Sequence, residues 1–242
     1  MPKFYNNARD HLLIFVQPTT DIPMATEEEL KTIAQQLALP TGSKGLEIAR
    51  MMETTNANMT AQALDALDMA AGQHVVEIGH GNASHLAGLL QRHPEIRYTG
   101  LETSVLMQTE AINRNREAVS NGRAKFFVYN GITLPDDLKE VDRIVTVNCI
   151  YFWPDPADFI NQLATRLLPK GRLIITFATK QFMEQLPFTG YGFRLYEEAD
   201  LLHLTNPTNL RHMQTLHAAE QVRSKAGQQV ERKFSTMVWE KR

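Results

Sequence analysis

The sequence is poor in cysteine and has no excess of charge of one sign. Its 242 residues include a single cysteine, Cys149, and 25 lysines and arginines stand against 27 aspartates and glutamates, which gives a net charge of −2. One cysteine excludes a disulfide framework within the chain and favours a reducing compartment. Without a basic excess, the charge does not point to nucleic acid as a partner.

Long apolar runs are also absent. The run Leu-Leu-Ile-Phe-Val at residues 12–16 is flanked by Asp10 and Gln17, and it is too short to span a membrane. No small-residue cleavage site follows it cleanly, so it is not typical of a signal peptide. We therefore expect a cytoplasmic protein without a membrane span.

The composition that remains is that of an ordinary globular protein, with 43% hydrophobic and 21% charged residues. The length allows one large α/β domain plus an extension. A capping box at residues 26–29 opens a helix that Pro40 and Gly42 end. We therefore predict an N-terminal helical extension over residues 1–42 and a main domain over residues 43–242.

The most informative segment is a strand followed by a glycine-rich turn and a helical pattern. The strand His-Val-Val-Glu-Ile at residues 74–78 leads into Gly79-His80-Gly81, and the helical pattern follows at residues 82–90. This arrangement is typical of a nucleotide-binding α/β unit, in which glycine lets the backbone approach a ligand closely. Ser84 occupies the third glycine position of the dinucleotide fingerprint, and Glu77 precedes the turn. An acid there suits a cationic ligand better than a pyrophosphate.

Strand-like and helical segments alternate from His74 onward, which predicts a parallel sheet with right-handed crossovers. The C-terminus differs, because residues 210–222 and 230–241 have the pattern of two long strands around a turn at residues 224–227. The sequence therefore predicts a parallel α/β core that ends in a hairpin.

Residues 76–83, Val-Glu-Ile-Gly-His-Gly-Asn-Ala, resemble motif I of the class I S-adenosylmethionine-dependent methyltransferases. The family pattern is an acid followed by Gly-x-Gly-x-Gly, and Ala83 stands in place of the last glycine. Further segments resemble later family markers in the same order: residues 98–102 ending in Glu102, residues 126–131, residues 141–148 followed by Tyr-Phe-Trp-Pro, and residues 168–175. The resemblance covers roughly residues 45–242 and is to small-molecule enzymes, such as those of quinone biosynthesis.

The resemblance implies a fold and a cofactor. The fold is α/β, a seven-stranded, mostly parallel, doubly wound sheet of the Rossmann-like methyltransferase type, with a C-terminal antiparallel hairpin. The cofactor is S-adenosyl-L-methionine. The residues placed at the cofactor are those of the turn and of the strand ends: Glu77, Gly79, His80, Gly81, Asn82, Glu102, Thr103, Asn130, Gly131, Asn148 and Tyr151.

Individual roles within this set follow from the family and leave alternatives open. Glu102 is expected to bind the ribose hydroxyls. Asn130 either meets the adenine edge or is a turn former before Gly131. Asn148 is expected to offer its backbone carbonyl to the amino group of the cofactor. The aromatic rings at residues 151–153 either face the sulfonium, as cation–π partners, or fill the core.

No proton acceptor is identified by the sequence. Tyr151, Tyr191 and His203 are candidates, as are Tyr5 and His11 in the N-terminal segment, although a lone His or Tyr is more often structural. An acceptor that is already an enolate or a phenolate needs little base. No cluster has convincing metal-ligand spacing, so no metal is expected.

The predicted function is methyl transfer to a small, apolar or aromatic acceptor, at carbon or oxygen ahead of nitrogen. Residues 1–42 and 182–193 are predicted to form the lid over that acceptor. The N-terminal arm has an alternative role in packing on the core or on a second subunit, which leaves room for a homodimer.

Two other functions stay open at this point. Ala83 and Asn130 depart from the family pattern, which keeps a non-catalytic, adenosylmethionine-binding or regulatory protein as an alternative. An NAD-dependent reductase on a related fold is disfavoured by Ser84 and by the C-terminal hairpin.

Overall fold

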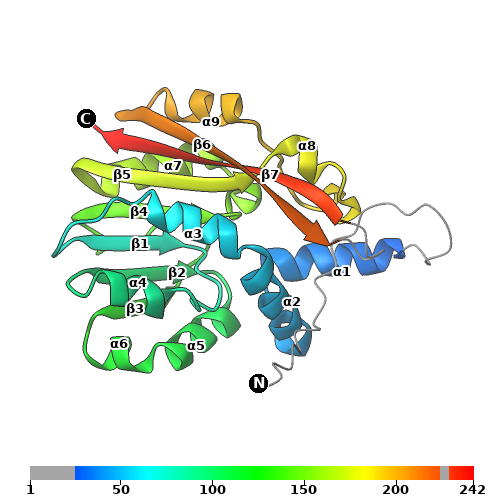
Figure 1. The fold of residues 1–242 in the computed structure, drawn as a ribbon, viewed down its shortest axis with the longest axis horizontal. Coiled ribbons are helices and arrows are strands. Elements are labelled where there is room, and N and C mark those ends of the chain that lie inside the picture. Colours follow the sequence, from blue (N-terminus) through cyan, green and yellow to red (C-terminus); the bar gives the residue numbers. More distant parts are fainter. Residues whose placement is uncertain (1–24, 224–228) are drawn as a thin grey trace, which may run out of the picture.

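The structure is a computed structural model, and it describes residues 25–223 and 229–242 (Figure 1). Seven strands form one sheet in the order β3-β2-β1-β4-β5-β7-β6. The strands are β1 His74–Ile78, β2 Arg97–Glu102, β3 Ala124–Val128, β4 Val141–Val147, β5 Leu167–Ala178, β6 Leu210–Arg223 and β7 Gln229–Lys241. Strands β1 to β5 pair in parallel, whereas β7 is antiparallel to both β5 and β6. The predicted fold class and the antiparallel C-terminal strands are confirmed.

Helices cover both faces of the sheet. The α-helices are α1 Glu27–Ala38, α2 Gly42–Thr55, α3 Ala57–Asp65, α4 Leu86–Arg92, α5 Val105–Arg114, α6 Arg116–Ser120, α7 Pro156–Arg166, α8 Lys180–Met183 and α9 Glu198–Thr205, and the 3-10 helices are η1 Ile150–Phe152 and η2 Pro187–Gly190. Successive strand residues point to opposite faces, so Val75 packs in one core cluster, with α3 and α4, and Val76 in the other, with α7. A strand buried on both faces has apolar residues at successive positions, as β1 has at Val75 and Val76.

Several helix boundaries follow local sequence signals. Thr26 and Glu29 form the expected reciprocal capping box at the start of α1, with Glu29 N–H donating to Thr26 Oγ1 at 3.3 Å. Asp155 caps α7, and Pro156 occupies its first turn.

The helix predicted to start at residue 82 begins instead at Leu86, so that boundary was wrong. Gly81 and Ala83 both have a positive φ, +55° and +47°, which is incompatible with a right-handed helix. The segment between the second glycine and α4 is therefore a loop.

The C-terminal hairpin is longer than any other strand pair of the described chain. The strands predicted at residues 210–222 and 230–241 are β6 and β7, and the turn predicted at residues 224–227 lies outside the described residues. Strand β7 joins the parallel part through β5, where the hydroxyl oxygens of Thr176 and Thr236 lie 2.7 Å apart in the core. The hairpin therefore completes the sheet.

Helix α1 projects from the body of the sheet and lies beside α2 (Figure 1). It also packs against η2, and Lys31 Nζ lies 5.6 Å from the centroid of the Tyr191 ring. Within residues 25–223 and 229–242, none of the helices has the length and apolarity needed to cross a membrane. Tyr5 and His11 lie outside the described residues.

Candidate functional site

Two adjoining cavities open at the carboxyl ends of the central strands. The first, of about 540 Å³, is lined by the loop after β1, the ends of β2 and β4, and helices α2 and α4. The second, of about 350 Å³, is lined by α1, α2, η1, α8 and the segment around η2. They share five wall residues: Leu37, Met52, Asn56, Asn148 and Phe152. Ligands of open α/β sheets bind at this edge.

The glycine loop forms the floor of the first cavity. Gly79 has φ +72°, and a Cβ built on it would lie 2.1 Å from Cys149 Sγ, so only glycine fits. A Cβ on Gly81 would meet nothing within 4 Å, although its φ is also positive. Ala83 completes the loop in the left-handed region, where the family pattern has glycine, and Asn115 Nδ2 donates to its carbonyl at 3.1 Å.

Glu102, at the end of β2, is fastened to this loop. Its Oε2 accepts from Gly81 N–H at 3.0 Å, and its Oε1 accepts from the N–H groups of Thr103 at 2.7 Å and Ser104 at 3.2 Å. Each carboxylate oxygen has two lone-pair sites, so acceptor capacity is left over. Glu102 and Thr103 both line the first cavity, so the carboxylate is preoriented beside the space that a ligand would fill.

Glu77, at the end of β1, is the most deeply buried acid of the cavity. His85 Nε2 lies 2.7 Å from Glu77 Oε2, and the Tyr98 hydroxyl donates to the same oxygen at 2.6 Å. Burial raises the pKa of Glu77, but the His85 charge and the two hydrogen bonds outweigh it, and the net shift is downward. Burial likewise lowers the pKa of His85, but Glu77 outweighs it and the net shift is upward. Both shifts favour the ionised form of the pair.

His85 was not identified as a site residue from the sequence. It precedes α4 and lines the cavity because the loop around Ala83 turns it back toward β1. Glu77 was the feature of the sequence that could have indicated such a partner, because a carboxylate in a buried strand requires a cation or hydrogen-bond donors nearby.

His80 lies under the loop and is 4% exposed. Its ring packs edge-on against Phe126, with centroids 5.0 Å apart, and close to Gly100, where a Cβ would come within 2.5 Å of His80 Cδ2. Neither ring nitrogen has a hydrogen-bond partner among the described residues, and burial lowers the pKa of His80. The ring is therefore neutral and belongs to the wall of the first cavity.

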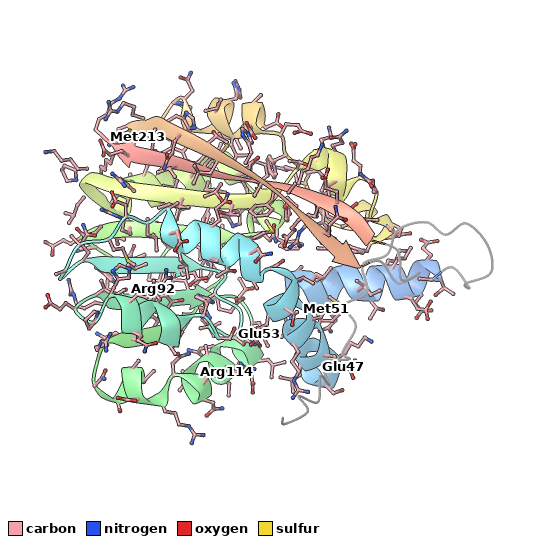
Figure 2. The ribbon with its side chains drawn as sticks, viewed as in Figure 1. Glu47, Met51, Glu53, Arg92, Arg114 and Met213 are labelled. Carbon is pink, nitrogen blue, oxygen red and sulfur yellow. The ribbon has the colours of Figure 1, made fainter. Side chains whose placement is uncertain are left out.

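Asn82 connects the loop to α2. Its Nδ2 donates to Glu53 Oε2 at 2.9 Å, and its Oδ1 accepts from Ser84 N–H at 3.2 Å. Glu53 also pairs with Arg114 of α5 at 3.3 Å, and Figure 2 shows these two side chains facing each other between the helices. Sequence reasoning missed Glu53, because α2 precedes all the motifs.

The first cavity is lined by more carboxylates than cationic side chains. Glu53, Glu77 and Glu102 are its carboxylates. Its cations are His85, held by Glu77, and Arg92, whose guanidinium pairs with Asp65 at 2.8 Å. A cationic ligand fits this lining, whereas a pyrophosphate would face three carboxylates.

The other predicted cofactor residues divide into two groups. Gly131 and Asn148 line the first cavity, and Asn148 Nδ2 donates to Asn56 Oδ1 at 3.1 Å. Asn130 does not line it. Asn130 Oδ1 accepts from the N–H groups of Ile132 and Thr133, each at 2.8 Å, which is the turn-forming role that stood as the alternative.

Of the proton-acceptor candidates that lie within the described residues, Tyr151 is the one that lines a cavity, the second. Its hydroxyl accepts from Ala178 N–H at 2.7 Å, and burial raises the pKa of Tyr151, so the phenol keeps its proton. Tyr191 faces Lys31, and His203 is exposed on α9; the structure brings neither of them to the cavities.

In the part of the chain that the structure describes, no group of three or more His, Cys, Asp or Glu side chains is arranged to hold a metal ion. Cys149 lies against Gly79, and burial raises the pKa of its thiol to about 12. At neutral pH this thiol is protonated and is no nucleophile.

The second cavity is apolar and aromatic. Phe152 packs on Phe193 with ring centroids 4.6 Å apart, and Phe193 packs on Phe188 at 5.7 Å. Methionines and aliphatic side chains complete the wall: Ile33, Leu37, Ile48, Met51, Met52, Phe182, Met183 and Leu186. Lys44 and Glu47, paired at 3.5 Å, are largely exposed at its rim.

The contact between Gly79 and Cys149 gives a testable prediction. Gly79→Ala should destabilise the fold by about 3 kcal/mol, because the new methyl group overlaps Sγ and the φ is unfavourable to any side chain. Cys149→Ala removes the sulfur and should restore part of that loss in the double variant. Urea unfolding of the two single variants and the double variant measures the coupling; additive effects would contradict the contact.

A second prediction concerns pH. The raised pKa of His85 means that its pairing with Glu77 stabilises the fold fully below about pH 6.5, the ordinary value for His, and that this stabilisation is lost as pH rises through the folded pKa. Below pH 6.5 and above the pKa of Glu77, His85→Gln should cost about 2 kcal/mol.

The cost of His85→Gln should shrink at alkaline pH, and urea unfolding across this range measures it. His217→Gln is the matched control, because His217 also lies 2.7 Å from a carboxylate, that of Glu198, but its side chain is 68% exposed. Equal pH dependence in both variants would refute a special role for the buried pair.

Comparison with known proteins adds independent findings. The family described as "Methyltransferase domain" matches residues 75–171, the stretch that contains the glycine loop, Glu102, strands β2 to β4 and all of β1 except His74. A solved structure of geranyl diphosphate methyltransferase in complex with S-adenosylmethionine superposes with a TM-score of 0.63 at 12% identity, covering 84% of this chain and 92% of that one. At this identity the likeness concerns the fold.

Two curated proteins are similar in sequence. A tRNA U34 carboxymethyltransferase of Idiomarina loihiensis is 30% identical over 111 residues, which are 45% of this chain and 34% of that protein. An O-methyltransferase of Aspergillus sclerotiorum is 25% identical over 124 residues, which are 51% of this chain and 47% of that protein. The matches span about a third to a half of these relatives.

The sheet order, the glycine loop with acids at the ends of β1 and β2, and the match over residues 75–171 agree with one another. These findings support the resemblance of this chain to the class I S-adenosylmethionine-dependent methyltransferases.

Proposed function

We propose that this protein transfers a methyl group from S-adenosylmethionine to a small, apolar or aromatic acceptor. The observation that carries the proposal is the junction of two unlike cavities. An acid-lined cavity over the glycine loop shares a wall with an apolar cavity, through residues that include Met52, Asn148 and Phe152. A cationic donor and an apolar acceptor would meet across that wall.

The first cavity fits S-adenosylmethionine by its donor set. Glu102 keeps acceptor capacity for the ribose hydroxyls, and Gly81 leaves room for close approach of the ligand to the backbone. Glu77, held ionised by His85, places negative charge near the cationic part of the ligand. A volume of about 540 Å³ is in the range of small-molecule sites.

The bound cofactor supplies an activated methyl group on a sulfonium. The protein has to align an acceptor with it and exclude water. Phe152 and Met52 lie at the junction and present apolar surface to both cavities. Since Tyr151 holds its proton, the acceptor is expected to be a carbon or oxygen nucleophile that is already electron-rich, ahead of a protonated amine.

Helix α1 and residues 182–193 serve as the lid in this proposal. Ile33 and Leu37 of α1 line the second cavity opposite Phe182 and Phe188, and α1 packs against η2. Leu37, Ala38 and Pro40 also line the first cavity, so this part of the predicted extension at residues 1–42 would cover both the cofactor and the acceptor. A homodimer and a cytoplasmic location stay predictions of the sequence.

One relative carries tRNA in its name, but the net charge of −2 gives this chain no overall excess of positive charge that would favour a polyanion. The apolar lining of the second cavity supports a small acceptor instead. The alternative of a non-catalytic role is supported by Ala83 and Asn130, the two residues that depart from the family pattern. Asn130 lies outside the lining of the first cavity.

Transfer of label tests the proposal. The purified chain is incubated with S-adenosylmethionine labelled in its methyl group and a panel of small phenols, enols, aromatic acids and amines. We expect label in a phenol or carbon acceptor, together with stoichiometric S-adenosylhomocysteine. Tight binding of both adenosyl ligands without transfer to any member of the panel would favour the non-catalytic alternative.

Glu102 provides the sharpest variant. Glu102→Gln keeps the shape but weakens the acceptors that hold Gly81 N–H and the ribose, so S-adenosylhomocysteine should bind about tenfold less tightly. Glu117→Gln, an exposed acid on α6, is the control and should leave the affinity unchanged. Calorimetry measures both. Unchanged affinity in Glu102→Gln would remove this carboxylate from the cofactor site.

A further inference from the structure

Among the described residues that line the second cavity, Arg232 is a buried cation within a mostly apolar and aromatic wall. Arg232 is on β7, its side chain is 5% exposed, and it lines the cavity with Met51, Phe182 and Phe188 among others. A guanidinium in such a place is costly unless its donors are satisfied. The partners of each donor therefore decide what the cavity offers to a ligand.

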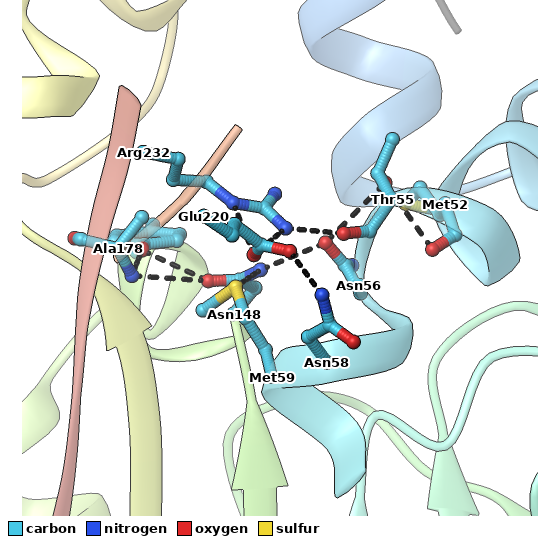
Figure 3. Close-up of polar contacts among 10 residues, drawn as sticks. Met52, Thr55, Asn56, Asn58, Met59, Asn148, Ala178, Glu220 and Arg232 are labelled. Atoms are coloured by element: carbon cyan, nitrogen blue, oxygen red, sulfur yellow. Dashed lines mark hydrogen bonds and ion pairs between the residues drawn. The ribbon is translucent and has the colours of Figure 1, made fainter. Parts of the chain in front are cut away.

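Two of the three guanidinium nitrogens are satisfied within the protein. Nε donates to Glu220 Oε1 at 3.0 Å, and Nη2 donates to the same oxygen at 2.5 Å and to the carbonyl oxygen of Thr55. The other oxygen of Glu220 accepts from Asn58 Nδ2 at 2.7 Å. Figure 3 shows this cluster between the hairpin and the junction of α2 with α3.

The third nitrogen, Nη1, makes no hydrogen bond with the residues that the structure describes. Glu220 lies outside the lining of the second cavity, whereas Arg232 is part of it. The carboxylate thus holds the guanidinium from one side, and the donor edge without a protein partner remains for the cavity.

The Nη1 edge of Arg232 lies close to the place where the proposed methyl transfer would occur. Thr55, which accepts from Arg232, precedes Asn56, and Asn56 accepts from Asn148 at the wall shared by the two cavities. The guanidinium therefore lies at the polar end of the second cavity, next to the junction, and the aromatic wall forms the remainder. The other cation of the lining, Lys44, is at the exposed rim and pairs with Glu47.

We propose that Arg232 is a specificity residue that binds an anionic oxygen of the acceptor, a carboxylate, phenolate or enolate. The inference rests on the proposed function and narrows its substrate class to small aromatic or apolar oxyanions. A guanidinium binds such an oxygen by charge-assisted hydrogen bonds, stronger than those to a neutral group. It would hold the anionic end of the acceptor near the junction and leave the apolar body among the methionines and phenylalanines.

The test compares two probes of the same shape, 2-naphthoate and 2-naphthamide, by calorimetry on the full chain saturated with S-adenosylhomocysteine. Near neutral pH the first is anionic and the second neutral. We expect the parent to prefer naphthoate about tenfold and Arg232→Gln to bind both probes alike. Arg232→Lys should keep part of the preference, because it retains a point charge.

Two further variants make the result decisive. Arg211→Gln removes an exposed arginine of the same hairpin, paired with Glu240 at 3.0 Å, and should leave the preference intact. Glu220→Gln removes the neutralising carboxylate and should strengthen the preference, which keeps the test valid if Arg232→Gln does not fold. A purely structural clamp would change melting temperature without changing the ratio of the two affinities.

Equal binding of the two probes by the parent, binding of neither, or an unchanged preference in Arg232→Gln would overturn the assignment. Failure of the proposed function is seen separately, as absence of binding by S-adenosylhomocysteine or of label transfer. A parent that prefers naphthoate but transfers no methyl group would retain Arg232 as an oxyanion site in a protein of different activity.

Discussion

The burial of two carboxylates at the ends of neighbouring parallel strands is the constraint on which the rest of the site depends. Glu77 and Glu102 sit at the carboxyl ends of β1 and β2, 3% and 7% exposed, and each has to be compensated. Glu77 is compensated by His85 and Tyr98, and Glu102 by three backbone N–H groups. These contacts set the path of the loop between them and give the first cavity its acidic lining.

The loop geometry follows from that arrangement. Gly81 must turn its N–H toward Glu102, and the chain then has to return His85 to Glu77 before α4 can begin. Positive φ at Gly81 and Ala83 accomplishes this return. An alanine in the left-handed region costs of order 1 kcal/mol in backbone strain. Here the pairing of His85 with the buried Glu77 offsets that cost.

The second cavity depends on parts of the chain that lie far apart in sequence. Its walls come from α1 and α2 before the sheet, from α8 and η2 after β5, and from Arg232 in the last strand. The hydrogen bond from Arg232 to Thr55 joins residues 177 positions apart. Under the proposed function, these distant segments would select the acceptor, while the ends of the central strands would hold the cofactor.

Much of the fold was predictable because its signals are local. Apolar runs bounded by glycine or proline predicted the strands, and the capping box that begins at Thr26 predicted the start of α1. The glycine loop and Glu102 were visible for the same reason. His85, Glu53 and Arg232 were not, because their roles come from partners that only tertiary structure brings near.

The start of α4 was misplaced because helical propensity in residues 82–85 yields to the pairing of Glu77 with His85. Asn130 illustrates the opposite case, since a strand-end position that the family uses for adenine is occupied here by a turn former whose Oδ1 is engaged by backbone. The local sequence pattern can identify Asn130 as a candidate, but the direction of its side chain depends on the loop that follows.

The most direct measurement of the central claim, a cavity built for a cationic adenosyl ligand, is calorimetric titration of the full chain with S-adenosylmethionine and with NADH. The account predicts one-to-one binding of S-adenosylmethionine and no binding of NADH, whose pyrophosphate would face Glu53, Glu77 and Glu102. Binding of NADH in preference to S-adenosylmethionine would contradict it.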